Sequence, residues 1–432
     1  MDPIVLKHCQ VFTPHNIVEM MWRIVRARRQ KIDTVLDLGA GDGRFAVGAN
    51  DANYVGYEID KTKIPFHQNE NVEFINRDVL ECEKRDYCLS IGNPPYIRKE
   101  LIDPTWRSKA IALLKRESGK IKPRADANAF VYFLWLSLLR THADGLIVQL
   151  VPFEWVSRPS AAPLRKFIQE NRWSVEVYRF SEDIFDRVLT TAAIVVIDKA
   201  RKSSDWHYFT VNTSGERTLT ATPTGGDAEA LGYSDRNDDA YALRGLSPGG
   251  QEIYVLTEEE RRFQGLEIGT DVTPCVTTLR HLESDQLALT DALFHREFVQ
   301  AGHRCWLIRS DREDRSAALN SYLESVKDAA SKYSTNTLRG EDWFKFRAHP
   351  VPDLIVASGF RNRGPKSFLN QANVITLGSV YAVFVRGKTR HSNMVRALRS
   401  YDFESQVVAH SNGLKKIEVK QLNSVLSQIV VR

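Results

Sequence analysis

The stretch "VLDLGAGDGRF", residues 35–45, decides the fold class of this chain. It begins with a mainly apolar run typical of a buried strand, and Gly39, Gly41 and Gly43 follow. Glycines at a strand end let the backbone turn tightly and approach a ligand at the next helix N-terminus. A dinucleotide-binding fingerprint would need glycine at position 44, where this chain has Arg44. The spacing therefore indicates a nucleotide-like ligand other than a dinucleotide.

Strand-like and helix-like segments alternate through residues 1–200. The further strand-like segments are "YVGYEID" (54–60), "VEFIN" (72–76), "YCLSIG" (87–92), "GLIVQLVP" (145–152), "SVEVYRF" (174–180) and "TAAIVVIDKA" (191–200). The helix-like segments include "NAFVYFLWLSLLR" (128–140) and "PLRKFIQEN" (163–171). This alternation predicts an α/β, Rossmann-like fold with a doubly wound, mainly parallel sheet.

The composition changes after residue 200. "TSGERTLTATPTGGDAEALGYSDRNDD", residues 213–239, is rich in Gly, Thr, Ser and Asp, as loops are. Residues further on show no clean βα repeat. We therefore expect a first domain over 1–200, a linker or loop region over 201–245, and a separate α+β domain over 246–432.

The bulk properties of the 432 residues exclude several classes of protein. The net charge of +5 and the pI near 8.8 are compatible with a polyanionic partner if the basic groups share one face. Five scattered cysteines without zinc spacing predict reduced thiols, a cytoplasmic location and no metal site. The start lacks a signal peptide, and the longest apolar run is too short for a bilayer, so no membrane association is expected.

Acidic residues stand near the ends of three consecutive strand-like segments. Asp37 lies two residues before the first glycine, Glu58 closes the second segment, and Asp78 follows the third. In an open parallel sheet these ends meet at one edge, where ligands bind. Glu58 can accept hydrogen bonds from two ribose hydroxyls, and Asp78 can accept them from a purine amino group. Each acid alone is also compatible with a solvated strand end or a turn.

The fourth strand-like segment runs into Asn93, Pro94, Pro95 and Tyr96. Proline cannot donate to a sheet ladder, so the pair stops the strand and stiffens the backbone beyond it. The Asn93 amide oxygen and the Pro94 carbonyl can then accept both N–H bonds of a weakly nucleophilic exocyclic amine. Tyr96 offers a face on which an unstacked base can lie. The alternative is a proline-rich turn with a packed tyrosine.

These motifs resemble those of S-adenosylmethionine-dependent methyltransferases of class I. Their order over residues 10–200 is similar to the γ-class N6-adenine DNA methyltransferases of restriction–modification systems (TaqI-like). "VFTPHNIVEMM", residues 11–21, looks like the N-terminal cofactor motif of that family, whose threonine is Thr13 here. The resemblance implies methyl transfer to adenine N6 in double-stranded DNA, with the adenine flipped out of the duplex.

The resemblance also implies roles for single residues. Thr13 would lie near the methionine carboxylate of the cofactor, Asp37 near its positive groups, and Asn93 beside it as well as at the target amine. "NAFVYF" is similar to a helix start whose aromatic residue packs on the cofactor adenine, which selects Phe133. "DIFDRVLTTAAIVVI" is similar to the segment whose phenylalanine stacks on the flipped base, which selects Phe185. The chain departs from the family at Asp186, where a proline is usual, and at 143–145, where Pro-Gly-Gly is usual.

The remainder of the chain resembles, more loosely, the target-recognition domain of the family. "ALRGLSPGGQEIYVLTEEE" (242–260) and "HSNGLKKIEVKQL" (410–422) look like its start and end. Basic residues that follow the Asn93–Tyr96 turn suit phosphate contacts, and "SGFRNRGPKSFLNQ" (358–371) suits base contacts. The DNA-contacting candidates from these two segments are Arg98, Lys99, Arg361, Asn362, Arg363 and Lys366.

Other activities share parts of this pattern. Cytosine-C5 methylation needs a thiolate at the catalytic turn, and the only Pro-Cys pair, Pro274-Cys275, lies far from it. N4-cytosine methylation usually has Ser or Asp in place of Asn93. RNA-adenine and protein-glutamine methyltransferases share the turn but generally lack a large second domain. A non-catalytic DNA-binding subunit is a further alternative, but it would not need the intact Asn93–Tyr96 turn. Any partner restriction endonuclease would be a separate chain.

Overall fold

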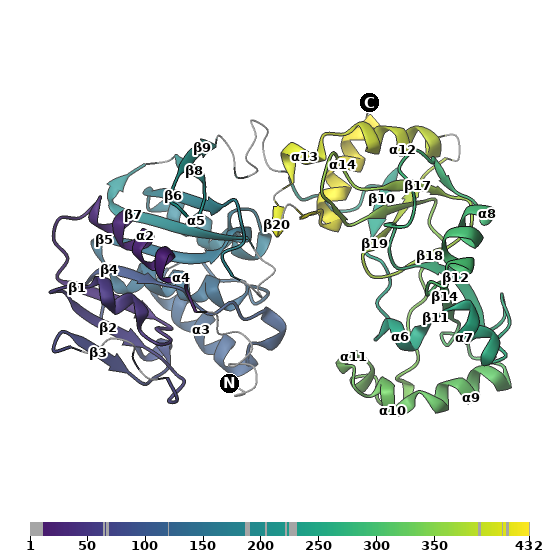
Figure 1. The fold of residues 1–432 in the computed structure, drawn as a ribbon, viewed down its shortest axis with the longest axis horizontal. Helices are drawn as coiled ribbons and strands as arrows, with labels where there is room; N and C mark the ends of the chain where they lie inside the picture. Colours follow the sequence, from purple (N-terminus) through teal and green to yellow (C-terminus); the bar gives the residue numbers. More distant parts are fainter. Residues whose placement is uncertain are drawn as a thin grey trace. The chain divides into compact units, whose positions relative to one another are not determined.

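The computed structural model describes residues 12–63, 65, 69–119, 121–185, 191–203, 205–220, 223, 231–387, 390–407, 409–411 and 414–431. The chain divides into two compact units (Figure 1). The first comprises Met1–Ala230 with Val408–Gly413, and the second comprises Leu231–Val407 with Leu414–Arg432. Each unit has hydrophobic clusters of its own.

Among the described residues, nine strands of the first unit form one sheet in the order β3-β2-β1-β4-β5-β7-β6-β8-β9. The strands are β1 (Thr34–Leu38), β2 (Asn53–Tyr57), β3 (Val72–Ile75), β4 (Tyr87–Gly92), β5 (Thr141–Pro152), β6 (Trp173–Phe180), β7 (Ala192–Lys202), β8 (Trp206–Val211) and β9 (Arg217–Thr220). The first five strands all pair in parallel, and β7 is antiparallel to both of its neighbours. This confirms the predicted α/β, mainly parallel architecture.

Helices cover both faces of this sheet (Figure 1). The apolar face of α2 (His15–Arg26) packs on one side, and α3 (Pro104–Glu117), α4 (Ala129–Arg140) and α5 (Ala162–Glu170) pack on the other. Because α4 lies between the sheet and α3, nearly all of its residues are buried. Short helical turns complete the unit: η1 (Arg44–Gly48), η2 (Val79–Glu81), η3 (Lys99–Leu101), η4 (Phe153–Val156) and η5 (Pro159–Ala161).

The structure differs from the linker or loop predicted over 201–245. Strands β8 and β9 lie inside that range and extend the sheet of the first unit, with β8 parallel to β6. Strand β10 (Ala240–Leu243) belongs to a sheet of the second unit. Aromatic and β-branched residues in "WHYFTV", residues 206–211, favour a strand, but the polar segment that follows masks them in the composition.

The second unit is an α+β structure. Its described part contains a five-stranded sheet in the order β10-β19-β15-β17-β13 and a four-stranded sheet in the order β11-β14-β12-β18, and β16 pairs with β21. These strands are β11 (Val255–Leu256), β12 (Val272–Val276), β13 (Ala288–Leu289), β14 (Trp306–Ile308), β15 (Leu354–Ala357), β16 (Gly359–Phe360), β17 (Ser367–Asn370), β18 (Ile375–Thr376), β19 (Val380–Val385) and β21 (Leu414–Lys416).

Helices of the second unit pack around these sheets (Figure 1). They are α6 (Gln251–Tyr254), α7 (Glu258–Phe263), α8 (Asp291–Phe294), η6 (His295–Gln300), α9 (Ala317–Ser325), α10 (Lys327–Ala330), α11 (Ser334–Thr337), η7 (Gly340–Asp342), α12 (His391–Ser400), α13 (Phe403–Gln406) and α14 (Val419–Val431). The tail "VVAHSNGLKKIEVKQL", residues 407–422, has the sequence pattern of a glycine turn followed by a strand. The strand is β21, and the turn lies outside the described residues. A short strand, β20 (Ala409–Ser411), lies in the segment grouped with the first unit.

In the part of the chain that the structure describes, no helix is long and apolar enough to cross a membrane. The described cysteines, Cys82, Cys88, Cys275 and Cys305, form no disulfide.

The turn after β1 depends on Gly43, which has φ of +72°. A Cβ at this position would lie 2.1 Å from Cζ of Phe74, whereas a Cβ at Gly41, with φ of +61°, would meet no atom within 4 Å. We expect Gly41→Ala to lower the free energy of unfolding by about 1 kcal/mol through backbone strain, and Gly43→Ala by about 2–4 kcal/mol through strain and overpacking. Urea unfolding followed by tryptophan fluorescence measures both. Equal losses in the two variants would contradict the role of the Phe74 contact.

Candidate active site

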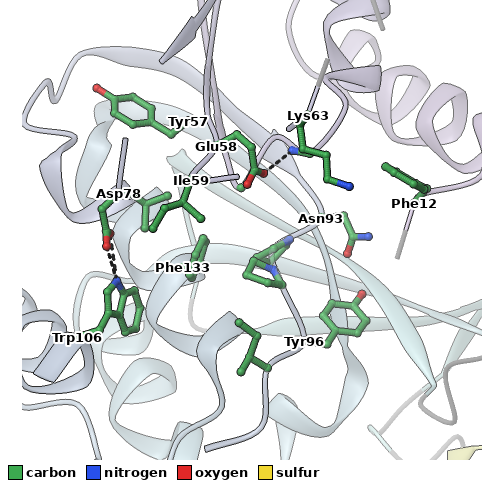
Figure 2. A pocket seen from close by; sticks show the side chains of 16 residues that line it. Phe12, Tyr57, Glu58, Ile59, Lys63, Asp78, Asn93, Tyr96, Trp106 and Phe133 are labelled. Atoms are coloured by element: carbon green, nitrogen blue, oxygen red, sulfur yellow. Dashed lines mark hydrogen bonds between the residues drawn. The ribbon is translucent and has the colours of Figure 1, made fainter. Parts of the chain in front are cut away.

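The C-terminal ends of β1, β2, β3 and β4 meet at one edge of the first unit's sheet. The strand order reverses between β1 and β4, which is where open α/β sheets bind ligands. A pocket of about 870 Å³, including solvent at its mouth, lies at this edge. Figure 2 shows Asp78 and Trp106 at one end of it, Asn93 and Tyr96 at the other, and Phe133 between them.

The glycine loop forms one wall of the pocket. Gly39 has φ of +79°, and a Cβ there would lie 3.2 Å from Cδ of Pro95 and 3.3 Å from Cε1 of Phe133. The loop backbone therefore passes between the proline turn and α4 in a space that only glycine fits without displacement. Gly41 also lines the pocket, and its N–H donates to Glu58 Oε2 at 2.9 Å.

Glu58 is held in place directly after β2. Its Oε2 accepts from the Gly41 N–H, and its Oε1 accepts from the Asp60 N–H at 2.9 Å. Each carboxylate oxygen has about two acceptor positions, so Glu58 can still accept bonds from a ligand. The two backbone bonds fix the carboxylate, and Figure 2 shows Glu58 at the pocket wall.

Asp78 occupies the far end of the pocket and binds an indole. The Trp106 Nε1–H donates to Asp78 Oδ2 at 2.8 Å and to Oδ1 at 3.1 Å (Figure 2). Oδ1 also accepts from the Leu80 N–H at 2.9 Å. The indole lies nearly parallel to Phe133, with ring centroids 6.1 Å apart and 25° between the planes.

The turn Asn93–Tyr96 begins where β4 ends, and all four of its residues line the pocket. Its far side is anchored to the start of α4, because the Ala129 N–H donates to the Ile97 carbonyl at 2.9 Å. The Tyr96 hydroxyl donates to the Leu150 carbonyl at 3.2 Å, which fixes the ring against β5. Burial raises the pKa of Tyr96 well above its ordinary value, so the hydroxyl stays protonated.

Phe133, the fifth residue of α4, lines the pocket. Phe185 does not line it and packs in the neighbouring hydrophobic cluster. Its ring meets Tyr96 edge-on, with centroids 6.2 Å apart and 78° between the planes. The structure therefore brings these two aromatic residues together, but not as two parallel walls around an empty space.

Thr13 also lies outside the pocket wall, 2% exposed, and its carbonyl accepts from the Arg44 guanidinium. Arg44 is paired with Asp42 at 2.6 Å and lies over the Phe12 ring, 4.8 Å from the ring centroid. The predicted N-terminal motif is therefore tied to the glycine loop through Arg44. Phe12, the residue before Thr13, is the one that lines the pocket.

Asp37 is buried within β1 and lies behind the pocket rather than on its wall. Its Oδ2 accepts from the Tyr54 hydroxyl at 2.6 Å, and among the described residues its Oδ1 has no hydrogen-bond partner. A Cβ on Gly92 would lie 2.2 Å from that Oδ1, so the carboxyl group packs against the end of β4. Burial raises the pKa of Asp37 to about 7, and the negative charge of Glu58 adds to the rise.

Several pocket residues escaped the sequence interpretation: Phe12, Ile59, Lys63 and Trp106. Ile59 directly follows Glu58, and this neighbouring position is the signal in the sequence that could have identified it as a pocket residue. Lys63 places its ammonium 4.8 Å from the Phe12 ring centroid at the pocket edge (Figure 2). Trp106 lies 28 residues after Asp78, and only tertiary packing brings the two together.

The predicted DNA-contacting residues fall into two groups. Arg98 and Lys99 are exposed just beyond the Asn93–Tyr96 turn, and 361–363 are exposed in the second unit. Lys366 is only half-exposed, because its ammonium donates to the carbonyls of Arg280 and Leu282. No group of three or more His, Cys, Asp or Glu side chains in the described part of the chain could hold a metal ion.

Each of the two units contains a segment that matches a known protein family. Residues 48–185 match the model of the Eco57I restriction-modification methylase, and residues 240–405 match the C-terminal domain of the type II methyltransferase M.Eco57I. The type II methyltransferase M.AccI of Acinetobacter calcoaceticus is 20% identical over 96% of this chain and 84% of its own length. M.HincII of Haemophilus influenzae is 26% identical over 43% of this chain, which covers 36% of that relative.

Among solved structures, the type IIL restriction-modification enzyme MmeI in complex with DNA has a similar fold. The TM-score is 0.62 at 13% sequence identity, and the match covers 94% of this chain and 65% of that one.

The raised pKa of Asp37 makes stability depend on pH. The folded protein binds this proton more tightly than the unfolded chain does. The contribution of Asp37 to the free energy of unfolding is therefore fully present below pH about 4 and is lost as the pH rises through about 7. Asp37→Asn mimics the protonated acid. We expect its free energy of unfolding to match the wild type near pH 4 and to exceed it by up to about 4 kcal/mol at pH 8.

Urea unfolding at pH 5, 6, 7 and 8 measures this difference. Asp51→Asn, at an exposed carboxyl group, is the matched control and should show no such trend. A gain for Asp37→Asn that is the same at pH 5 and pH 8 would refute the buried-acid interpretation.

Proposed function

Because this chain belongs to the restriction–modification DNA methyltransferases, we propose that it methylates the N6 atom of a specific adenine in duplex DNA. The methyl donor of this family and fold is S-adenosylmethionine. The proposal rests on the observation that a single pocket brings together the groups that the reaction needs. The Asn93–Tyr96 turn and the carboxylates Glu58 and Asp78 line it together.

The pocket residues fit this cofactor. Gly39 leaves a narrow path between Pro95 and Phe133, where a side chain would intrude. Glu58 would accept from the ribose hydroxyls, and Asp78 would accept from the adenine amino group. Phe133 would pack on the adenine ring, which its position between the two ends of the pocket supports (Figure 2).

Thr13 and Asp37 keep indirect roles in this proposal. Thr13 is tied by Arg44 to the glycine loop that would carry the methionine part of the cofactor. Asp37 packs behind the end of β4 and would support the turn that faces the methyl group.

S-adenosylmethionine supplies an electrophilic methyl group on a sulfonium ion. Asn93 and the Pro94 carbonyl would act on the second reactant, the target adenine. Adenine N6 is a weak nucleophile because its lone pair is delocalised into the ring. Two acceptors that bind both N–H bonds localise that lone pair and direct it at the methyl group. The prolines and the anchor at Ala129 keep these acceptors in place without reorganisation.

The flipped adenine would stack on Tyr96 and be covered by Phe185. A stacked base contributes roughly 1–3 kcal/mol. Since Phe185 meets Tyr96 edge-on, its ring has to move before a base can lie between the two. Removal of the base from the duplex requires a few kcal/mol, which contacts to the DNA backbone offset.

Duplex DNA would be bound by both units. Arg98 and Lys99 are exposed beside the catalytic turn and would contact phosphates. In the second unit, the proposed recognition domain, the exposed segment 361–363 offers Arg and Asn side chains that can read base edges. Lys366 is assigned a structural role, because its ammonium binds backbone carbonyls. A separately encoded restriction endonuclease is the proposed functional partner, and the cytoplasm is the proposed place of action.

Asn93→Ala tests the chemistry. The wild type, incubated with plasmid DNA and labelled S-adenosylmethionine, should yield N6-methyldeoxyadenosine after digestion to nucleosides, as identified by mass spectrometry. The variant should lose about 10²–10³-fold in turnover, because it lacks one acceptor at the transition state. Calorimetric cofactor binding should stay within a few-fold of the wild type. Unchanged turnover would refute the role of Asn93, and N4-methyldeoxycytidine as the product would refute adenine as the target.

Substitutions at Tyr96 separate stacking from hydrogen bonding. Tyr96→Phe keeps the ring and loses the bond to the Leu150 carbonyl, so we expect a decrease in kcat/KM of about tenfold or less. Tyr96→Ala removes the stacking surface and should cost about tenfold more than Tyr96→Phe. Single-turnover methylation of a duplex that contains the target site measures both. Equal losses in the two variants would argue against a stacked base.

A further inference from the structure

The Asp78 end of the pocket contains a side chain to which the proposed function gives no role. Trp106 lines the pocket, and its indole N–H donates to both Asp78 oxygens, at 2.8 and 3.1 Å (Figure 2). It comes from the first turn of α3, whereas Asp78 comes from the turn after β3.

Three contacts fix the direction of this indole. The Trp106 backbone N–H donates to the Asp103 side chain at 2.8 Å, which caps α3. One face of the ring lies against Phe133, and the ring meets Tyr132 edge-on with centroids 6.1 Å apart and 79° between the planes. Since both aromatic partners belong to the buried helix α4, the indole N–H has little freedom to turn away from Asp78.

The donors around Asp78 leave one acceptor position for a ligand. Oδ1 accepts from the Leu80 N–H and the indole, whereas among the described residues Oδ2 accepts from the indole alone. A carboxylate oxygen has about two acceptor positions, so Oδ2 keeps one. An ionised carboxylate in this place can accept from an amino group but repels a carbonyl oxygen.

We propose that Trp106 is a positioning residue for cofactor recognition. Its indole N–H holds the Asp78 carboxylate so that Oδ2 accepts from the adenine amino group and rejects a keto group at the same ring position. This inference rests on the role that the proposed function gives to Asp78. It predicts that Trp106 controls the choice between an amino and a keto purine more than it controls overall affinity.

The test compares S-adenosylhomocysteine with S-inosylhomocysteine, which carries a keto group in place of the adenine amino group. For each variant of the full chain, calorimetry gives the dissociation constant of S-inosylhomocysteine divided by that of S-adenosylhomocysteine. Trp106→Phe keeps an aromatic ring without the donor and should reduce this ratio about tenfold. Benzothienylalanine at position 106 has a ring of indole size without the N–H, so it should give the same reduction even if phenylalanine packs poorly.

Trp22→Phe is the matched control. It also removes a buried indole donor, here from the Phe45 carbonyl at 3.0 Å, but it lies outside the pocket. Its ratio should equal that of the wild type. An unchanged ratio in both Trp106 variants, with discrimination lost in Asp78→Asn, would overturn the role of Trp106 alone. An unchanged ratio in Asp78→Asn would overturn the assignment of Asp78 and the inference that rests on it.

Discussion

The pairing of β4 between β1 and β5 is the constraint on which the rest of the first unit depends. In register, Ser90 lies beside Leu36 of β1 and Ile147 of β5, so the end of β4 is held from both sides. The chain can then stop at Gly92 and turn at the two prolines without freedom to drift. The oxygens of Asn93 and Pro94 therefore take their places from the sheet, and the other pocket residues are arranged around them at the same edge.

In the pocket, a single carboxylate group serves both the protein and a ligand. Some of its acceptor positions bind donors of the protein, and the others stay available to a ligand. Glu58 uses one acceptor position on each oxygen for the backbone of the glycine loop and of Asp60, and keeps the rest for a ligand. Asp78 uses its positions in the same way, with Leu80 and Trp106 as internal donors. A carboxylate that is already oriented by the protein loses little entropy when a ligand arrives. Asp37 shows the opposite case, because burial without a second donor favours its protonated form.

Local sequence was sufficient for strands β1 to β7, the glycine loop and the acids after the strands, because each depends on neighbours in the chain. The orientation of Asp37 was also open to prediction from the alternation of side chains along a strand. Leu36 and Leu38 join the cluster that contains Phe133, so Asp37 has to face the other side of the sheet with Tyr54. Trp106 was not predictable, because its partner is set by the packing of α3 on α4. The carbonyl partners of Lys366 were hidden for the same reason, since composition shows a charge but not what it binds.

The described residues that line the pocket all lie between Phe12 and Phe133, within the first unit. The second unit has hydrophobic clusters of its own. Substitutions in the exposed loops of the second unit therefore change none of the side chains that line the pocket. A lineage with this arrangement can diversify by drift or recombination in its second half, while selection for turnover acts on the first.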